Sequence, residues 1–227
     1  MARELARRSL PSGRTARVVM SEAADGDAAK CDLAIDGLMD TQGQQRPWTS
    51  LHQVHGDGVV VVEFPGDRSG SHADGAITVA SGSPLAVRVA DCMPVALLGD
   101  HSVGVVHAGW RGLLDGVVER TIEVQAALNG SSITEATIGP HIRPCCYEFH
   151  DMDIDKFVER FGPSARSKTS EGQPALDLAA ILAVILDQSG IPGKFDVSCT
   201  ACDHRYWSFR ATATTCRQAM VAWIEES

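Results

Sequence analysis

Residues 85–112 read LAVRVADCMPVALLGDHSVGVVHAGWRG. Apolar runs rich in β-branched residues, at 85–90, 95–98 and 103–107, alternate with short turn signals, which is typical of neighbouring strands. Gly99-Asp100 is a turn signal between the second and third runs. The stretch therefore predicts three strands in close succession, the last of which ends at His107, just before a helix.

The regions on either side extend the same pattern. Strands are expected at 49–55 and 59–63 as neighbours around the turn 56–58, at 75–79 before the turn 81–84, at 195–200, and, as helix or strand, at 215–225. Apolar spacing predicts helices at 112–128, 153–161 and 177–188. Strands come in runs before helices, which favours an α+β fold with mixed sheets over a doubly wound parallel sheet.

Bulk properties limit the class of protein. With 227 residues, the chain is expected to form a single domain over 1–227. A net charge of −9 argues against a dedicated binder of nucleic acid or membrane surfaces. Residues 1–20 carry five arginines and are expected as a flexible basic N-terminus. No signal-peptide pattern follows them, so a cytoplasmic location and free thiols on the seven cysteines are expected.

Three residues near predicted strand ends can do chemistry together. Cys92 and His107 end two neighbouring strands, and His55 ends a third. One thiolate and two imidazoles suit zinc, and three protein ligands leave a fourth position for water or substrate. The alternative reading is a small buried cysteine with ordinary surface or core histidines, since the spacing matches no recognised metal motif.

The residues after His107 suggest an anion site. Gly109 and Gly112 permit close backbone approach where the chain enters a helix, and a helix N-terminus offers free N–H groups to phosphate. Arg111 lies there with a guanidinium suited to phosphate or carboxylate. Asp91 precedes Cys92 and is a candidate orienting residue or general base.

Several motifs, in consistent order over about residues 48–224, carry a resemblance to a known family. They are Gln53-Val54-His55-Gly56, Ala73-Asp74-Gly75, Ala90–Val95, His107–Gly112, Ile138-Gly139-Pro140, Tyr147-Glu148, Leu176-Asp177-Leu178, Cys199-Thr200 and Trp207–Arg210. The chain resembles the polyphenol oxidase/laccase-domain family of purine nucleoside phosphorylases, also labelled YfiH-like or multicopper polyphenol oxidases. The His-Ala-Gly-Trp-Arg-Gly run is the most specific of these motifs.

The resemblance implies a fold, a site and an activity. The fold would have four layers, α/β/β/α, similar to that of the cytotoxic-necrotising-factor deamidases. The metal-binding trio would be His55, Cys92 and His107, with zinc as the expected ion and copper as the alternative. The activity would be phosphate-dependent cleavage of adenosine, inosine and methylthioadenosine, which makes the protein a transferase, together with hydrolytic deamination of adenosine.

Roles follow for the candidate residues. Arg111 would hold phosphate with the backbone near Gly109 and Gly112, and Arg210 would join the substrate-binding residues. His107 or a zinc-bound water would protonate the leaving purine. Cys92 and Asp91 complete the catalytic set. The partners would be purine nucleosides and phosphate, with no nucleic acid or membrane, and the protein would be a monomer or homodimer.

The chain also departs from the family pattern. Residues 21–47 lack the usual N-terminal motifs, and His141 stands where the family has cysteine. His141 is expected to be either a fourth ligand or, as favoured here, a surface residue. Cys199-x-x-Cys202 is a single motif and weak evidence for a metal, and Cys145-Cys146 is interpreted as packing.

Three other functional classes stay open. The first is a hydrolase or deamidase with Cys92 as nucleophile and His107 as its base. The second is a copper-dependent polyphenol oxidase, or laccase. The third is a non-catalytic relative that binds a nucleotide.

Overall fold

The computed structural model describes residues 2–38, 42, 44–128 and 130–226. Two large sheets form its centre. The six-stranded sheet has the order β12-β9-β7-β8-β5-β4. Its strands are β4 (Val59–Val62), β5 (Gly75–Thr78), β7 (Met93–Gly99), β8 (Val103–Ala108), β9 (Ile133–Ile138) and β12 (Gly193–Phe195). The sheet is mixed, because β4 runs parallel to β5 and β12 parallel to β9.

The five-stranded sheet has the order β1-β2-β13-β6-β3. Its strands are β1 (Arg3–Ser9), β2 (Thr15–Met20), β3 (Thr49–Ser50), β6 (Leu85–Val89) and β13 (Gln218–Ile224). The sheet packs face to face on the six-stranded sheet through β6 and β13, and alternate apolar side chains of both sheets fill the space between them. A separate small ribbon pairs β10 (Arg166–Lys168) with β11 (Pro174–Leu176).

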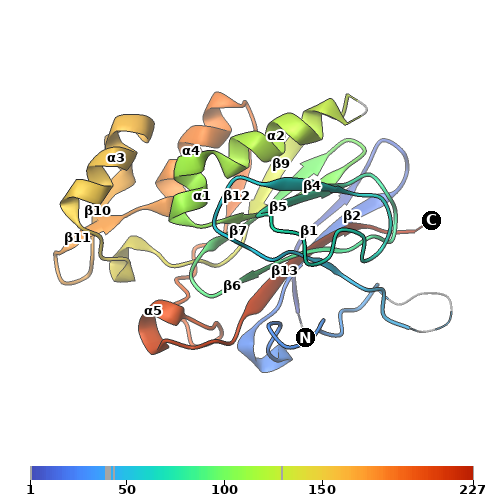
Figure 1. The fold of residues 1–227 in the computed structure, drawn as a ribbon, viewed down its shortest axis with the longest axis horizontal. Coiled ribbons are helices and arrows are strands. Elements are labelled where there is room, and N and C mark those ends of the chain that lie inside the picture. Colours follow the sequence, from blue (N-terminus) through green and yellow to red (C-terminus); the bar gives the residue numbers. More distant parts are fainter. Residues whose placement is uncertain (1, 39–41, 43, 129, 227) are drawn as a thin grey trace.

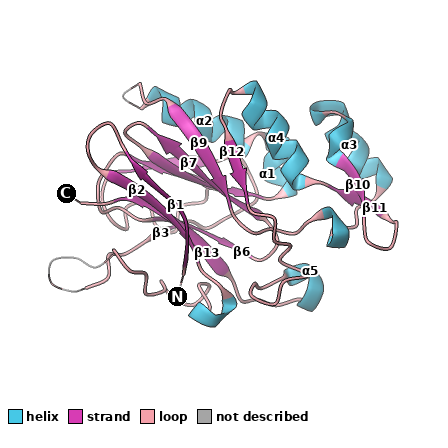
Figure 2. Ribbon diagram, turned by 180° about the vertical axis from the view of Figure 1, so that it is seen from behind, coloured by secondary structure: helices cyan, strands magenta, loops and turns pink. Residues whose placement is uncertain are grey.

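Helices cover the other face of the six-stranded sheet (Figures 1 and 2). They are α1 (Trp110–Asp115), α2 (Val117–Ala127), α3 (Asp151–Phe161) and α4 (Leu178–Gln188), with the short α5 (Phe209–Thr212) set apart from them. One apolar core joins the helices to this sheet. The outer face of the five-stranded sheet is covered by irregular chain that buries Leu33, Leu38 and Trp48, beside the 3-10 helix η1 (Ala23–Asp25).

The predicted α+β architecture with mixed sheets is confirmed. The β7–β8 hairpin forms around the predicted turn, with Val95 opposite Val106. The helices predicted at 153–161 and 177–188 are α3 and α4, and the Asp177 carboxylate accepts a hydrogen bond from the Ala180 N–H at the start of α4. The expected helix 112–128 is divided at Gly116, whose left-handed φ of 91° ends α1 and begins α2.

Some predicted pairings were wrong. The strands on either side of the turn 56–58 are not neighbours, because β3 pairs with β6 in one sheet and β4 with β5 in the other. The same holds for the strands flanking the turn 81–84. The strand expected at 195–200 is only β12, which ends at Phe195. Turn signals between two apolar runs show that the chain leaves a strand, and they carry no information about which sheet it enters next.

The basic N-terminus is ordered, where a flexible segment was expected. Strands β1 and β2 form an antiparallel hairpin, and β2 pairs in turn with β13. Buried Val18 and Met20 anchor the hairpin between the sheets, and Arg17 forms an ion pair with Glu4, with Nε and Oε2 2.8 Å apart. Arg3, Arg7 and Arg8 lie on β1 and Arg17 on β2, whereas Arg14 lies in the turn between these strands. None of the helices in the described part of the chain has the length and hydropathy to cross a membrane.

Candidate functional site

Three chain segments bring the predicted trio together where the two sheets meet. Cys92 lies in the turn from β6 to β7, and His55 lies in the loop from β3 to β4. In both places the chain passes from the five-stranded to the six-stranded sheet. His107 is on β8, directly opposite Pro94 of β7. The junction between the sheets thus gathers residues that are far apart in the sequence.

The ligand atoms of the trio converge on one point. The side-chain ligand atoms of His55, Cys92 and His107 all lie within 4.8 Å of one another. The Cys92 Sγ is 3.9 Å from the His55 Nε2, and the two imidazole rings meet edge to face with centroids 4.8 Å apart. His107 is buried, whereas His55 and Cys92 are half-buried. The trio is thus a buried corner that opens on one side.

Asp74 organises the trio, and sequence analysis gave it no role. One of its carboxylate oxygens lies 2.7 Å from the His107 Nδ1, so this nitrogen carries the proton and Nε2 faces the site. The same carboxylate accepts the backbone N–H groups of Val54, His55 and Gly56. His55 has a left-handed φ of 61°, which these three bonds hold in place. The Ala73-Asp74-Gly75 motif was the available signal.

Electrostatics couple the members of the trio. Burial raises the pKa of the Asp74 carboxyl, but hydrogen bonds from His107 and from the Gly56 N–H outweigh it and hold this pKa below its usual value. Burial also disfavours charge on Cys92 and His107. Their mutual attraction nevertheless lowers the pKa of the Cys92 thiol and raises that of the His107 imidazole, with Asp74 contributing to the second shift. Both shifts favour the charged forms, a thiolate on Cys92 and an imidazolium on His107.

A cavity of about 830 Å³ opens beside the trio. Its wall contains four arginines and one aspartate, Asp91, and one of the arginines, Arg88, is paired with Asp32 at 3.2 Å. The arginines in the wall are Arg88, Arg111, Arg210 and Arg217. The aromatic rings in the wall are Trp110, Tyr147 and Phe209, and Phe209 is 57% exposed although it is apolar. The cavity therefore offers positive charge and flat apolar surface next to the trio.

Arg111 and Arg210, the two arginines expected to bind substrate, both lie in this wall. The exposed Arg111 guanidinium stacks over the Trp110 ring at 4.4 Å, and that of Arg210 lies over Tyr147 at 5.1 Å. Gly109 and Gly112 are not among the lining residues. An added Cβ at Gly109 would lie 2.9 Å from the His55 Cδ2, and one at Gly112 would lie 3.0 Å from the Gly56 carbonyl oxygen. Both glycines let the start of α1 pack against the loop that carries His55.

Asp91 lines the cavity, but its carboxylate is occupied. Its Oδ1 accepts a hydrogen bond from the Thr200 hydroxyl at 2.7 Å, and its Oδ2 accepts one from the Arg210 N–H at 2.6 Å. These bonds fix the start of α5 and hence the position of Arg210. His141 is buried away from the cavity, between the Gly139 carbonyl and the Arg143 guanidinium. The surface position favoured from the sequence is therefore wrong, because His141 is a buried histidine whose two ring nitrogens both have partners.

Known proteins resemble the chain over most of its length. The family model described as "Multi-copper polyphenol oxidoreductase laccase" matches residues 16–225. A Mycobacterium tuberculosis protein named purine nucleoside phosphorylase is 36% identical over 181 residues, which cover 77% of this chain and 71% of that protein. A Streptomyces coelicolor protein of the same name is 35% identical over 181 residues, covering 77% and 74%.

Solved structures share the fold. A Neisseria meningitidis protein of family DUF152 superposes with a TM-score of 0.76 at 20% identity, covering 99% of both chains. YlmD from Geobacillus stearothermophilus gives a TM-score of 0.74 at 24% identity, covering 95% of this chain and 93% of its own. Since the family model spans nearly the whole chain, this protein belongs to the multi-copper polyphenol oxidoreductase laccase family, whose curated relatives here are enzymes named purine nucleoside phosphorylases.

Proposed function

We propose that this protein is a purine nucleoside phosphorylase that cleaves adenosine, inosine and methylthioadenosine with phosphate and also deaminates adenosine. The observation that carries the proposal is the cavity, in which the trio, four guanidinium groups and three aromatic rings share one wall. A nucleoside and phosphate need these three kinds of surface. The names of the relatives that are about 36% identical support the same activity.

The residues of the trio fit a zinc ion. In a tetrahedral site with Zn–S of about 2.3 Å and Zn–N of about 2.0 Å, sulfur and nitrogen lie about 3.5 Å apart. The 3.9 Å between the Cys92 Sγ and the His55 Nε2 is close to that value. A bound zinc would supply Lewis acidity and would lower the pKa of whatever group completes its coordination. Copper shares these ligand types and is the alternative ion.

Arg111 is the proposed phosphate ligand. Its side chain is exposed at the cavity wall, and stacking on Trp110 orients the planar guanidinium while leaving its N–H groups available. Arg210 would share the anion, since Asp91 fixes the backbone that carries it. Gly109 and Gly112, which do not line the cavity, are left out of the proposed phosphate site. Asp91 is in this account a positioning residue.

The aromatic wall is the proposed purine subsite. Phe209 lines the cavity and is more than half exposed, and Tyr147 and Trp110 lie in the same wall. A purine ring stacked there would bury flat apolar surface on both partners. The ribose would then lie between the base and the arginines, with its C1′ facing the phosphate.

Phosphorolysis needs one bond formed, one bond broken and one proton moved. A phosphate oxygen forms a bond to C1′ as the C1′–N9 bond breaks, and the purine leaves with the bonding electrons and takes up a proton. Because Asp74 occupies Nδ1 of His107, Nε2 either donates this proton or holds the metal ion. Loss of turnover on chelation would assign Nε2 to the metal. In deamination a water oxygen forms a bond to C6 of adenosine, the bond from C6 to the amino nitrogen breaks, and ammonia leaves, which gives inosine.

The direct test is incubation of the purified protein with adenosine or inosine, with and without phosphate. Chromatography separates adenine, hypoxanthine and inosine. We expect free base only when phosphate is present, and inosine from adenosine in both conditions. Free base formed equally without phosphate, or no loss of nucleoside, would contradict the proposal.

A second candidate is a thiol hydrolase or deamidase with Cys92 as nucleophile. The lowered pKa of Cys92 beside His107 favours it, because a thiolate is the attacking species. Metal analysis separates the two candidates. Zinc that is lost in Cys92→Ala, together with activity lost on chelation, supports the phosphorylase, whereas metal-free activity lost on alkylation of Cys92 supports the hydrolase. Oxygen reduction by several coppers needs more ligands than the three residues of this site offer.

A further inference from the structure

A second group of potential metal ligands lies outside the reaction cavity. In the described residues, Cys145, Cys146, Cys199 and Cys202 place their sulfur atoms within 4.8 Å of one another. The Cys202 Sγ is 3.2 Å from that of Cys146 and 3.7 Å from that of Cys145, and all four cysteines are free thiols. Four thiols from two distant segments thus converge on one point, which we call the cysteine cluster.

We propose that the cysteine cluster binds a structural zinc ion as four thiolates, separately from the His55, Cys92 and His107 trio. Four sulfurs at about 2.3 Å from a tetrahedral zinc lie about 3.8 Å apart. The Cys145–Cys202 separation of 3.7 Å is close to that value, the Cys146–Cys202 separation of 3.2 Å is shorter, and all four sulfurs lie within 4.8 Å of one another. Closed four-cysteine sites of this kind hold zinc for folding, with no position left for substrate. Binding releases the thiol protons to solvent.

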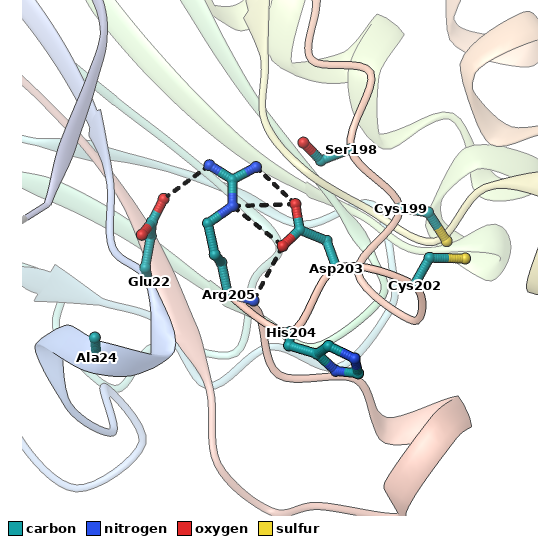
Figure 3. A pocket seen from close by; sticks show the side chains of 8 residues that line it. All are labelled: Glu22, Ala24, Ser198, Cys199, Cys202, Asp203, His204 and Arg205. Carbon is teal, nitrogen blue, oxygen red and sulfur yellow. Dashed lines mark hydrogen bonds and ion pairs between the residues drawn. The ribbon is translucent and has the colours of Figure 1, made fainter.

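The backbone holds the sulfur atoms ready for a metal. The N–H groups of Cys202 and Asp203 both donate to the Cys199 carbonyl, which makes a tight turn of Cys199-x-x-Cys202. Figure 3 shows the two sulfur atoms of this turn side by side, with the His204 ring directed away from them. The Arg143 N–H donates to the Cys199 Sγ at 3.4 Å, so the segment before Cys145 already contacts the turn. Little rearrangement is needed for binding.

Solvent can reach the cluster. Cys202 is exposed, and with Cys199 it lines a cavity of about 680 Å³ that also contains Glu22, Asp203 and Arg205 (Figure 3). The Arg205 guanidinium in this cavity is paired with Glu22 and Asp203. A metal ion can therefore enter from this side without passing the reaction cavity.

The position of the cluster explains what the ion would do. It would join the loop after β9 to the loop after β12, which are held together near Cys199 by the bridge to His141. Tyr147 follows Cys146 directly and lines the reaction cavity. Thr200 lies within the Cys199–Cys202 turn and donates to Asp91, which fixes Arg210. A metal here would therefore restrict the motion of residues that line the cavity beside the trio.

The test is metal content after purification with reductant and loading with Zn²⁺, measured by elemental analysis. Cys202→Ser and Cys146→Ser should each lose about one zinc per chain relative to the parent protein, whatever the trio binds. Cys31→Ser, which changes an exposed cysteine outside the cluster, should lose none. Cys92→Ala should retain the zinc of the cluster. Unchanged zinc content in both cluster variants would overturn the proposal.

Cobalt gives a second readout that needs no cluster variant. The Cys92→Ala protein loaded with Co²⁺ should show the intense sulfur-to-metal charge transfer and visible bands of a tetrahedral tetrathiolate site. Absence of these bands would overturn the proposal. Mass spectrometry of the protein freshly purified with reductant is a further check. Disulfides among the four cysteines would also overturn the proposal, because sulfurs joined by a bond of about 2.05 Å could not serve as thiolate ligands. None of these readouts depends on nucleoside turnover.

Discussion

Asp74 is the residue on which the geometry of the trio depends. It is fully buried, it fixes the proton of His107 on Nδ1, and it accepts three backbone N–H groups of the loop that carries His55. Both oxygens of a carboxylate accept hydrogen bonds, whereas an amide has one oxygen that accepts and one NH₂ group that only donates. A single residue thus positions two members of the trio.

Asp74→Asn should therefore reduce both metal affinity and turnover by about 10- to 100-fold, the usual cost of removing such an orienting partner. The amide nitrogen would face N–H donors that it cannot satisfy. The measurements are zinc affinity by competition with a chelator and kcat/KM for phosphate-dependent cleavage of inosine. Asp115→Asn, on the exposed side of α1, is the control and should change neither. Parent-like zinc affinity in Asp74→Asn would show that Asp74 does not organise the site.

Sequence analysis identified the residues of the site better than their roles. The trio was predicted from short motifs, and the spacing of His55, Cys92 and His107 could not have shown that they meet. Asp74 was quoted in a motif but had no visible partner, because its contacts come from a loop that folds back only in the tertiary structure. Asp91 was predicted beside the chemistry, and its carboxylate in fact binds Thr200 and the start of α5.

At the scale of elements, the short helix α1 positions the site by close packing. Gly109 precedes α1 and has no room for a side chain, since an added Cβ would lie 2.9 Å from the His55 Cδ2 and 3.2 Å from the Cys92 Sγ. Both of these neighbours belong to the proposed metal site. The glycine therefore allows the β8–α1 connection to pass directly behind two ligands.

Gly109→Ala should displace His55 or Cys92 and lower kcat/KM by about 100-fold, because misplacement of reacting groups by about 1 Å has that cost. Its backbone φ of −76° is accessible to alanine, so the fold should persist. Circular dichroism checks the fold, and steady-state kinetics check the activity. A folded Gly109→Ala protein with parent-like kcat/KM would contradict this account of α1.

Elements whose pattern is local were predicted well. Helices α3 and α4 and the β7–β8 hairpin follow from apolar spacing and turn residues within each segment. The sheet to which each strand belongs was not predictable in this way, because β3 and β4 are close in sequence but pair with different partners. The cysteine cluster was missed for a related reason, as its two pairs of cysteines are brought together only by the fold.

At the scale of the whole molecule, stability should depend on a buried neutral histidine. Burial, with Arg143 nearby, lowers the pKa of His141 to about 4. The unfolded chain, with a histidine pKa of about 6.5, therefore binds a proton at a pH where the folded protein does not. Stability is complete above about pH 6.5 and is lost as the pH falls towards 4.

Between pH 7 and pH 5, this histidine should cost the parent protein about 2 kcal/mol of unfolding free energy. His141→Gln has a side chain that can donate to the Gly139 carbonyl and accept from Arg143, and it does not titrate. Urea unfolding at both pH values should show a pH-dependent loss smaller by that amount in the variant. Equal losses in the two proteins would mean that His141 is not held neutral by the fold.

His55, Cys92 and His107 are expected to act as one reaction centre. The most direct measurement is kcat/KM for phosphate-dependent cleavage of inosine in His55→Ala, Cys92→Ala, His107→Ala and the Cys92→Ala, His107→Ala double variant. Residues that act as a unit are strongly non-additive. We therefore expect each single variant to lose about 1,000-fold or more, and the double variant to lose little beyond that. Full turnover in Cys92→Ala or His107→Ala would contradict the account.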